Sequence, residues 1–211
     1  MLNYLLRSCP DIATALSYVA SKSCKPSRPD YEWTRDHGLV ILPGDHHQPL
    51  QLKCYVDAFF MSHEDSRAHS GYCLSVGDLS AFYSKSNKQP LVATSSTHAE
   101  VKALYQLVTD LIYLINLSDE SGKSIALPAV IFEDNNPTVQ LASSLSARIK
   151  RSKHFLMPIN FIKHQVTFGL VTTHDNVAGV LTKPLSWREF GPKAACLLGI
   201  PEEEFTQTYS S

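Results

Sequence analysis

The chain has 211 residues, of which 44% are hydrophobic, and its formal net charge is −1. This length and apolar content allow one sizeable core and exclude a disordered or fibrous chain. The near-neutral charge excludes an overall basic field, so any attraction to nucleic acid must come from a local cluster.

Five cysteines are scattered along the chain without a C-x-x-C pair: Cys9, Cys24, Cys54, Cys73 and Cys196. This pattern argues against a disulfide framework and against a structural zinc site, and it indicates a reducing compartment. No apolar run approaches the roughly 20 residues of a membrane span, and the start MLNYLLRSCPD lacks a signal-peptide core. We therefore expect a soluble intracellular protein, cytoplasmic or nuclear, without a membrane partner.

The chain divides into unequal parts. Residues 3–21 carry apolar residues at near-helical spacing, and residues 24–49 contain four prolines and the polar run GDHHQP, which is typical of a linker. We expect residues 1–49 to form a separate segment, residues 50–186 to form the main domain, and residues 187–211 to form a C-terminal helix and tail.

Three stretches at the start of the main domain have the composition of β-strands, with turns expected at Gly71 and Gly77. We expect these strands to pair as antiparallel neighbours. They are residues 52–60, 70–76 and 80–86.

A long helix follows, because apolar residues recur with helical spacing over residues 94–120. Ser95, Ser96 or Thr97 can cap this helix. Glu100 follows Thr97 by three positions, which matches a capping box.

The remaining pattern predicts a short apolar strand over residues 127–134 and helices over residues 136–142, 153–165 and 187–198. Gly169 is expected to end the helix that begins at Lys153. Strands alternating with helices in this way predict an α/β fold, with helices on the faces of a sheet.

Three carboxylates lie at the edges of these elements: Asp57, Glu100 and Asp134. Each has a local explanation, since acids are common where strands and helices begin or end. Together they fit a metal site, because Mg²⁺ prefers hard oxygen ligands and keeps several waters. Two such ions roughly 4 Å apart can hold both the attacking water and the leaving oxygen of a phosphodiester.

Several longer strings carry a family resemblance over most of residues 10–185. They are PDIATALSYVA, YVDA, HSGYCLS, SKSNKQPLVATSSTHAEVKAL, IFEDNNPTVQLA, KRSKHFLMPINFIK and AGVLTKPL. The chain resembles the ribonuclease H domain of copia-type LTR retrotransposon polyproteins, preceded by the end of the reverse transcriptase. This resemblance implies a ribonuclease H-like fold, with a mixed five-stranded sheet flanked by helices, acting on the RNA strand of RNA–DNA hybrids.

The resemblance assigns roles to the acids. Asp57 matches the aspartate that bridges two metal ions, and Glu100 and Asp134 match two further ligands, so two Mg²⁺ or Mn²⁺ ions are expected. A fourth acid belongs in the segment that reads VAGVLTKP here, where Gly179 replaces it. We expect this loss to weaken the ion on the nucleophile side, unless Asp175, four residues earlier, reaches the site.

Two further departures from the family pattern concern the flanks of the domain. The run FGLVTTHDNVAG leaves room only for a shortened fifth strand, and the stretch PSRPDYEWTRDHGLVIL lacks part of the helix that normally leads into its final strand. Residues 1–49 as a whole match a remnant of the reverse transcriptase C-terminus. The catalytic acids of the polymerase do not occur in these residues. We therefore expect no reverse transcription by this chain alone, and the missing polymerase portion is a possible partner.

One dense basic cluster precedes the helix expected from Lys153. Its members are Arg148, Lys150, Arg151, Lys153 and His154. Such a strip can contact backbone phosphates of a hybrid, although a solvated helix start explains it as well.

Three functions remain open on these grounds. The first is metal-dependent endonucleolytic cleavage of RNA in RNA–DNA hybrids, impaired by the loss of the fourth acid at Gly179. The alternatives are a non-catalytic hybrid-binding remnant and a degenerate transposon fragment without activity. Restoration of activity by Gly179→Asp would argue for an intact scaffold that lacks only a ligand.

Overall fold

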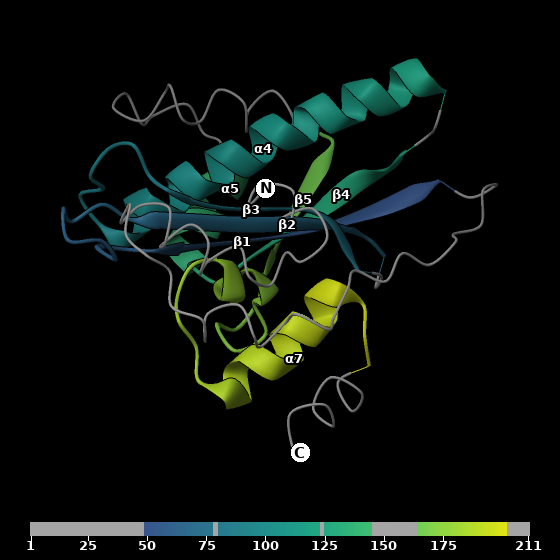
Figure 1. Cartoon of the computed structure of the whole chain (residues 1–211). Helices are drawn as coiled ribbons and strands as arrows, with labels where there is room; N and C mark the ends of the chain where they lie inside the picture. The colour runs from purple at the N-terminus through teal and green to yellow at the C-terminus, as the bar shows by residue number, and fades with distance from the viewer. Residues whose placement is uncertain (1–48, 78–79, 123–124, 145–163, 202–211) are drawn as a thin grey trace, which may run out of the picture.

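The structure is a computed structural model that describes residues 49–77, 80–122, 125–144 and 164–201. Its centre is a five-stranded sheet with the order β3-β2-β1-β4-β5 (Figure 1). The strands are β1 (Leu50–Phe59), β2 (His69–Val76), β3 (Ala81–Lys88), β4 (Ile125–Glu133) and β5 (Val166–Leu170).

The first three strands are antiparallel neighbours, whereas β4 runs parallel to β1 and β5 runs parallel to β4. This mixed sheet is the ribonuclease H-like fold that the sequence predicted. The expected strands and helices within the described residues are present, with bounds that differ by a few residues at most.

One face of the sheet is covered by the long helix α4 (Ser96–Ser121), which crosses the strands (Figure 1). The alternate residues Leu52, Cys54 and Val56 of β1 point to this face, as strand geometry requires. They pack against the apolar stripe of α4, which includes Leu104 and Leu111. This layer forms the larger core.

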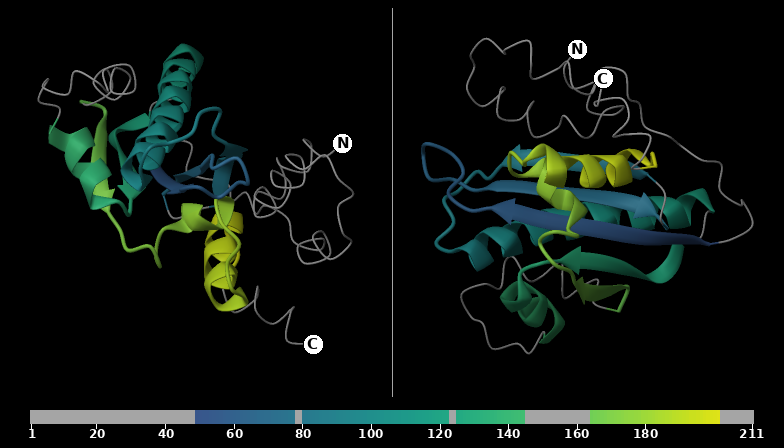
Figure 2. Two further views of the ribbon diagram at one scale, coloured as in Figure 1. Left: turned by 90° about the vertical axis from the view of Figure 1, so that its left-hand side faces the viewer. Right: turned by 90° about the horizontal axis from the view of Figure 1, so that it is seen from below.

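The opposite face is covered by the 3₁₀-helix η2 (Val177–Leu181) and the helix α7 (Trp187–Leu198), which lie below the sheet in Figure 1 and in front of it in the right-hand view of Figure 2. Here Cys73 of β2 packs against Leu181 and Leu197. Because both of its faces are covered, β2 is buried over seven of its eight residues.

Two glycines correct expectations from the sequence. Gly169 lies inside β5 and pairs with Phe132 of β4, so it does not end a helix. A Cβ at Gly169 would come within 2.9 Å of the Phe132 ring, which explains the glycine by close packing. Gly71 likewise lies within β2 and not in a turn.

The fifth strand is short but paired. Its five residues, Val166–Leu170, all pair with β4, and the helix α5 (Asn136–Ser144) packs against it. Residues 145–163, which carry the basic cluster and almost all of the helix predicted from Lys153, lie outside the described residues. So do residues 1–48, and the predicted domain boundaries stay predictions.

Within the described part of the chain, Cys54, Cys73 and Cys196 form no disulfide bond. No described helix is long and apolar enough to cross a membrane.

Candidate metal centre

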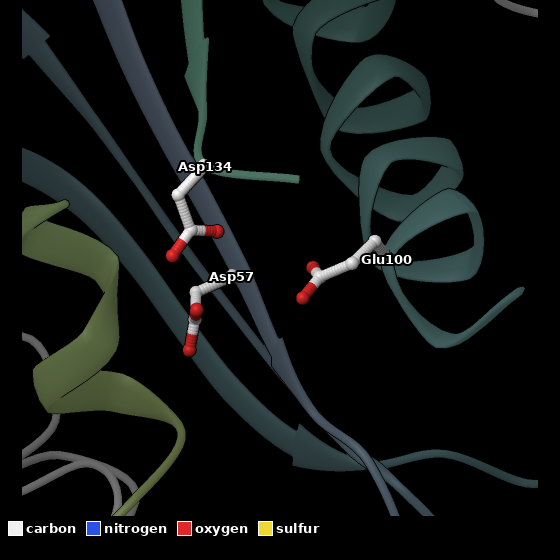
Figure 3. Close-up of side chains that lie close together, drawn as sticks. All are labelled: Asp57, Glu100 and Asp134. Atoms are coloured by element: carbon white, nitrogen blue, oxygen red, sulfur yellow. The ribbon is translucent and has the colours of Figure 1, made fainter. Parts of the chain in front are cut away.

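The three acids singled out by the sequence lie together. One carboxylate oxygen from each of Asp57, Glu100 and Asp134 can be chosen so that all three atoms lie within 4.8 Å of one another. Figure 3 shows Glu100 reaching from α4 toward the two aspartates. We call these three residues the acid cluster.

Asp57 owes its position to a close approach between β1, β2 and η2. It pairs with Gly71 of β2, and a Cβ at Gly71 would come within 2.6 Å of the Thr182 methyl carbon. The absent side chain lets the end of η2 lie on the sheet beside Asp57. Asn176 fixes the start of η2, since its Nδ2 donates to the Val56 carbonyl at 2.8 Å.

Both oxygens of the Asp57 carboxylate have partners. The Thr182 hydroxyl donates to Oδ2, and the Lys183 ammonium lies 3.3 Å from Oδ1. Asp57 itself is only 2% exposed. The carboxylate is therefore held in one orientation by two adjacent residues of the LTKP segment.

Glu100 is not the capping-box partner that the sequence offered. Ser95 caps α4, and its hydroxyl accepts from the His98 backbone N–H at 3.1 Å. Glu100 therefore lies in the second turn, where its side chain is 5% exposed. Its Oε2 has no hydrogen-bond partner among the described residues. A buried carboxylate oxygen in this condition is costly unless a cation approaches it.

Asp134 follows the end of β4 and is half-buried. Its neighbour Glu133, which the sequence analysis did not single out, is fully buried at 0% exposure. Glu133 shares the face of β4 that Ala129 and Ile131 present to α4, because side chains alternate along a strand. Its Oε1 accepts from the Asn135 backbone N–H at 3.0 Å, whereas Oε2 has no partner among the described residues.

Burial and mutual repulsion raise the pKa values of this group. Burial raises the pKa of Asp57, although Lys183 and Thr182 oppose this shift. The pKa of Glu100 is raised well above its ordinary value, first by burial and then by the negative charges of Glu133, Asp57 and Asp134. A divalent cation would relieve both effects, so the oxygen donors present fit Mg²⁺ or Mn²⁺.

Gly179 is buried in η2, where it faces cations. A Cβ built at this position would lie 3.2 Å from the Lys193 ammonium and 3.5 Å from Lys183 Cε. Lys193, on α7, donates to the carbonyl oxygens of Thr173 and Asn176 at 2.8 and 3.0 Å. Neither lysine was predicted as part of the site. In the sequence, Lys183 marks only the family segment LTKP, and Lys193 belongs only to the helix expected over residues 187–198.

Asp175 does not substitute for the missing acid. Its side chain is exposed and is engaged locally, with Oδ2 accepting from the Thr172 hydroxyl at 2.6 Å and Oδ1 lying 3.3 Å from His174 Nδ1. It does not belong to the acid cluster. The alternative in which Asp175 reaches the metal site is therefore not supported in this conformation.

The basic cluster of Arg148, Lys150, Arg151, Lys153 and His154 lies outside the described residues. Its placement relative to the acids stays a prediction.

Comparisons with known proteins bear on the family. No protein-family model matches the chain. The chain is similar to the retrovirus-related Pol polyprotein from transposon RE2 of Arabidopsis thaliana, with 30% identity over 203 residues, covering 88% of this chain. It is also similar to that from transposon RE1 of the same plant, with 29% identity over 205 residues, covering 90% of this chain. The chain spans 14% of the length of each of these relatives.

Three solved structures are also similar. LC11-RNase H1 in complex with an RNA/DNA hybrid has a TM-score of 0.49 and 16% identity, covering 63% of this chain and 94% of that one. RNase H1 from the halophilic archaeon Halobacterium salinarum has a TM-score of 0.42 and 13% identity, covering 63% and 94%. The foamy viral protease-reverse transcriptase in complex with dsDNA has a TM-score of 0.46 and 14% identity, covering 67% and 93%.

Proposed function

We infer a function from the family to which this chain belongs, the retrovirus-related Pol polyproteins of copia-type transposons, of which it is a ribonuclease H-like domain. The acid cluster holds Mg²⁺ or Mn²⁺, and the domain hydrolyses the RNA strand of RNA–DNA hybrids. The observation that carries this proposal is the convergence of Asp57, Glu100 and Asp134, with one Glu100 oxygen that no described residue hydrogen-bonds.

The residues of the site have different roles in this proposal. Asp57, Glu100 and Asp134 supply the oxygen ligands, while Thr182 and Lys183 keep the Asp57 carboxylate oriented. A bound divalent ion would supply Lewis-acid stabilisation to the phosphodiester during attack by water. The low exposure of Asp57 and Glu100 keeps bulk water from screening their charges.

The basic cluster supplies the second part of the proposal. Arg148, Lys150, Arg151, Lys153 and His154 contact backbone phosphates of the hybrid, which positions the RNA strand without reading its sequence. Neutralising Lys150, Arg151 and Lys153 should weaken hybrid binding and flatten its dependence on salt. Full affinity in that triple variant would remove these residues from the interface.

A cleavage assay on a labelled RNA–DNA hybrid tests the proposal. We expect cleavage with Mg²⁺ or Mn²⁺ and none with a chelator. Asp57→Asn should reduce the rate by about 100-fold or more, since it removes charge needed to hold the ion. Glu120→Gln, an exposed acid at the far end of α4, is the matched control and should cleave like the wild type.

One observation favours a second candidate, the non-catalytic hybrid-binding domain. Gly179 supplies no carboxylate, and Lys193 lies where that carboxylate would point. This candidate predicts salt-dependent binding to the hybrid with no product at any Mg²⁺ or Mn²⁺ concentration. Cleavage by the wild type that Asp57→Asn abolishes would reject it.

A further inference from the structure

The Lys183 ammonium lies against the acid cluster from the side of η2. It forms an ion pair with Asp57 Oδ1 at 3.3 Å, and its side chain is only 22% exposed. Partial burial makes this contact stronger than a surface ion pair. A fixed positive charge is therefore already present beside the carboxylate expected to bridge two metal ions.

The coordination capacity of Asp57 is limited by this arrangement. A carboxylate bridges two ions best when both of its oxygens are free to face metals. Here Oδ2 accepts the Thr182 hydroxyl, and Oδ1 already faces Lys183. Each oxygen keeps a lone pair for a metal, but the Lys183 charge beside Oδ1 opposes a second divalent ion next to one bound with Glu100 and Asp134.

The surroundings of Gly179 disfavour a second divalent ion in the same region. No carboxylate comes from position 179, and the Lys193 ammonium lies 3.2 Å from its Cβ position. Lys193 is itself held by the Thr173 and Asn176 carbonyl oxygens. A divalent ion entering here would meet two ammonium groups, and the described residues would offer it no new anionic ligand.

We propose that the Lys183 ammonium takes the place of the second cation, so that the acid cluster binds one divalent ion. This inference rests on the proposed metal site and changes its stoichiometry. Lys183 neutralises one carboxylate of the cluster, and Lys193 weakens the binding of any further cation on the side of Gly179.

Counting bound Mn²⁺ tests this proposal. The electron paramagnetic resonance signal of free Mn²⁺ gives the number of ions taken up by the folded protein. We expect one ion for the wild type and a second, weaker ion for Lys183→Met, whose side chain keeps the apolar stem of lysine but removes the competing charge. Lys183→Gln repeats the test with a polar side chain if the methionine variant folds poorly, and circular dichroism checks the fold of each variant.

Two control variants test whether the charge at position 183 is responsible for the number of bound ions. Lys183→Arg keeps the charge and should bind one ion. Lys88→Met removes an ammonium that pairs with Asp65, outside the acid cluster, and should also bind one ion.

The outcomes separate this proposal from the metal site itself. Two ions in the wild type would overturn the role of Lys183 while leaving the metal site in place. One ion in both neutral variants of Lys183 would overturn it as well. No bound ion in any of the proteins would overturn the metal site and this inference with it.

Discussion

The Lys193 ammonium lies 3.2 Å from the point where a Cβ at Gly179 would sit. In the folded protein, a cation therefore lies beside the position where the fourth acid is missing. From the sequence alone, Gly179 is the loss of one ligand, which predicts that a single back-substitution restores the site. The structure adds a lysine from α7 that such a substitution must face.

Gly179→Asp should therefore change hybrid cleavage by less than about threefold, because the new carboxylate will pair with Lys193 and be withdrawn from a metal. Adding Lys193→Met frees that carboxylate, and the double variant should cleave faster than Gly179→Asp alone. The measurement is the initial cleavage rate at saturating Mn²⁺. Lys193→Met alone is the matched control. A rise of about tenfold or more in the single variant would show that Lys193 does not hold the new side chain.

Whether the sequence predicts a feature of the fold or the site depends on how far apart in the chain the interacting residues lie. Alternating apolar residues predict β1 and the face it presents to α4, since that pattern is local. Asp57 and Asp134 were placed correctly near the ends of strands for the same reason. The ion pair of Asp57 with Lys183 spans 126 positions of the chain, so no local pattern reveals it.

Local patterns also misled where tertiary structure decides. Thr97 and Glu100 match a capping box, yet Ser95 caps the helix and Glu100 lies close to Asp57 and Asp134. Glu133 was not singled out from the sequence, because an acid at the end of a strand usually reaches solvent. Its burial depends on α4, which comes earlier in the chain and covers that face of the sheet.

Glu133→Gln should stabilise the metal-free protein at neutral and alkaline pH. Burial raises the pKa of Glu133 well above its ordinary value of 4.5. Its contribution to stability is therefore fully present below about pH 4, where the carboxyl is protonated in both states, and is lost as pH rises through the raised pKa. Glutamine removes this loss and keeps an oxygen for the Asn135 N–H, so the gain should reach about 1–2 kcal/mol at pH 8.

Urea denaturation in the presence of a chelator, repeated from pH 4 to pH 8, measures this effect. Glu120→Gln serves as the control, since Glu120 is exposed on α4. A gain of stability that is constant with pH would contradict an origin in the charge of Glu133.

Gly71→Ala should destabilise the protein and loosen the acid cluster together. The added methyl would come within 2.6 Å of Thr182 and 2.7 Å of the Leu181 Cβ, so η2 must move away from β2. Overpacking of this kind costs about 1–3 kcal/mol. The displacement also carries Lys183 away from Asp57, so Mn²⁺ uptake should change. Unchanged stability and unchanged Mn²⁺ uptake would contradict this packing.

Thr182→Val tests the hydroxyl that holds Asp57, because valine keeps the shape of threonine and removes only the donor. The Asp57 carboxylate is 2% exposed, and its Oδ2 loses this donor in the variant. An unsatisfied buried carboxylate oxygen costs about 1–3 kcal/mol, and we expect that loss in the metal-free protein by urea denaturation at pH 7. Thr109→Val is the matched control, since Thr109 is exposed and donates to the Tyr105 carbonyl one helical turn away. Saturating Mn²⁺ should recover part of the loss in Thr182→Val, because a cation on the carboxylate compensates for the missing donor. Equal losses in the two valine variants would mean that the Thr182 hydroxyl contributes nothing specific to the acid cluster.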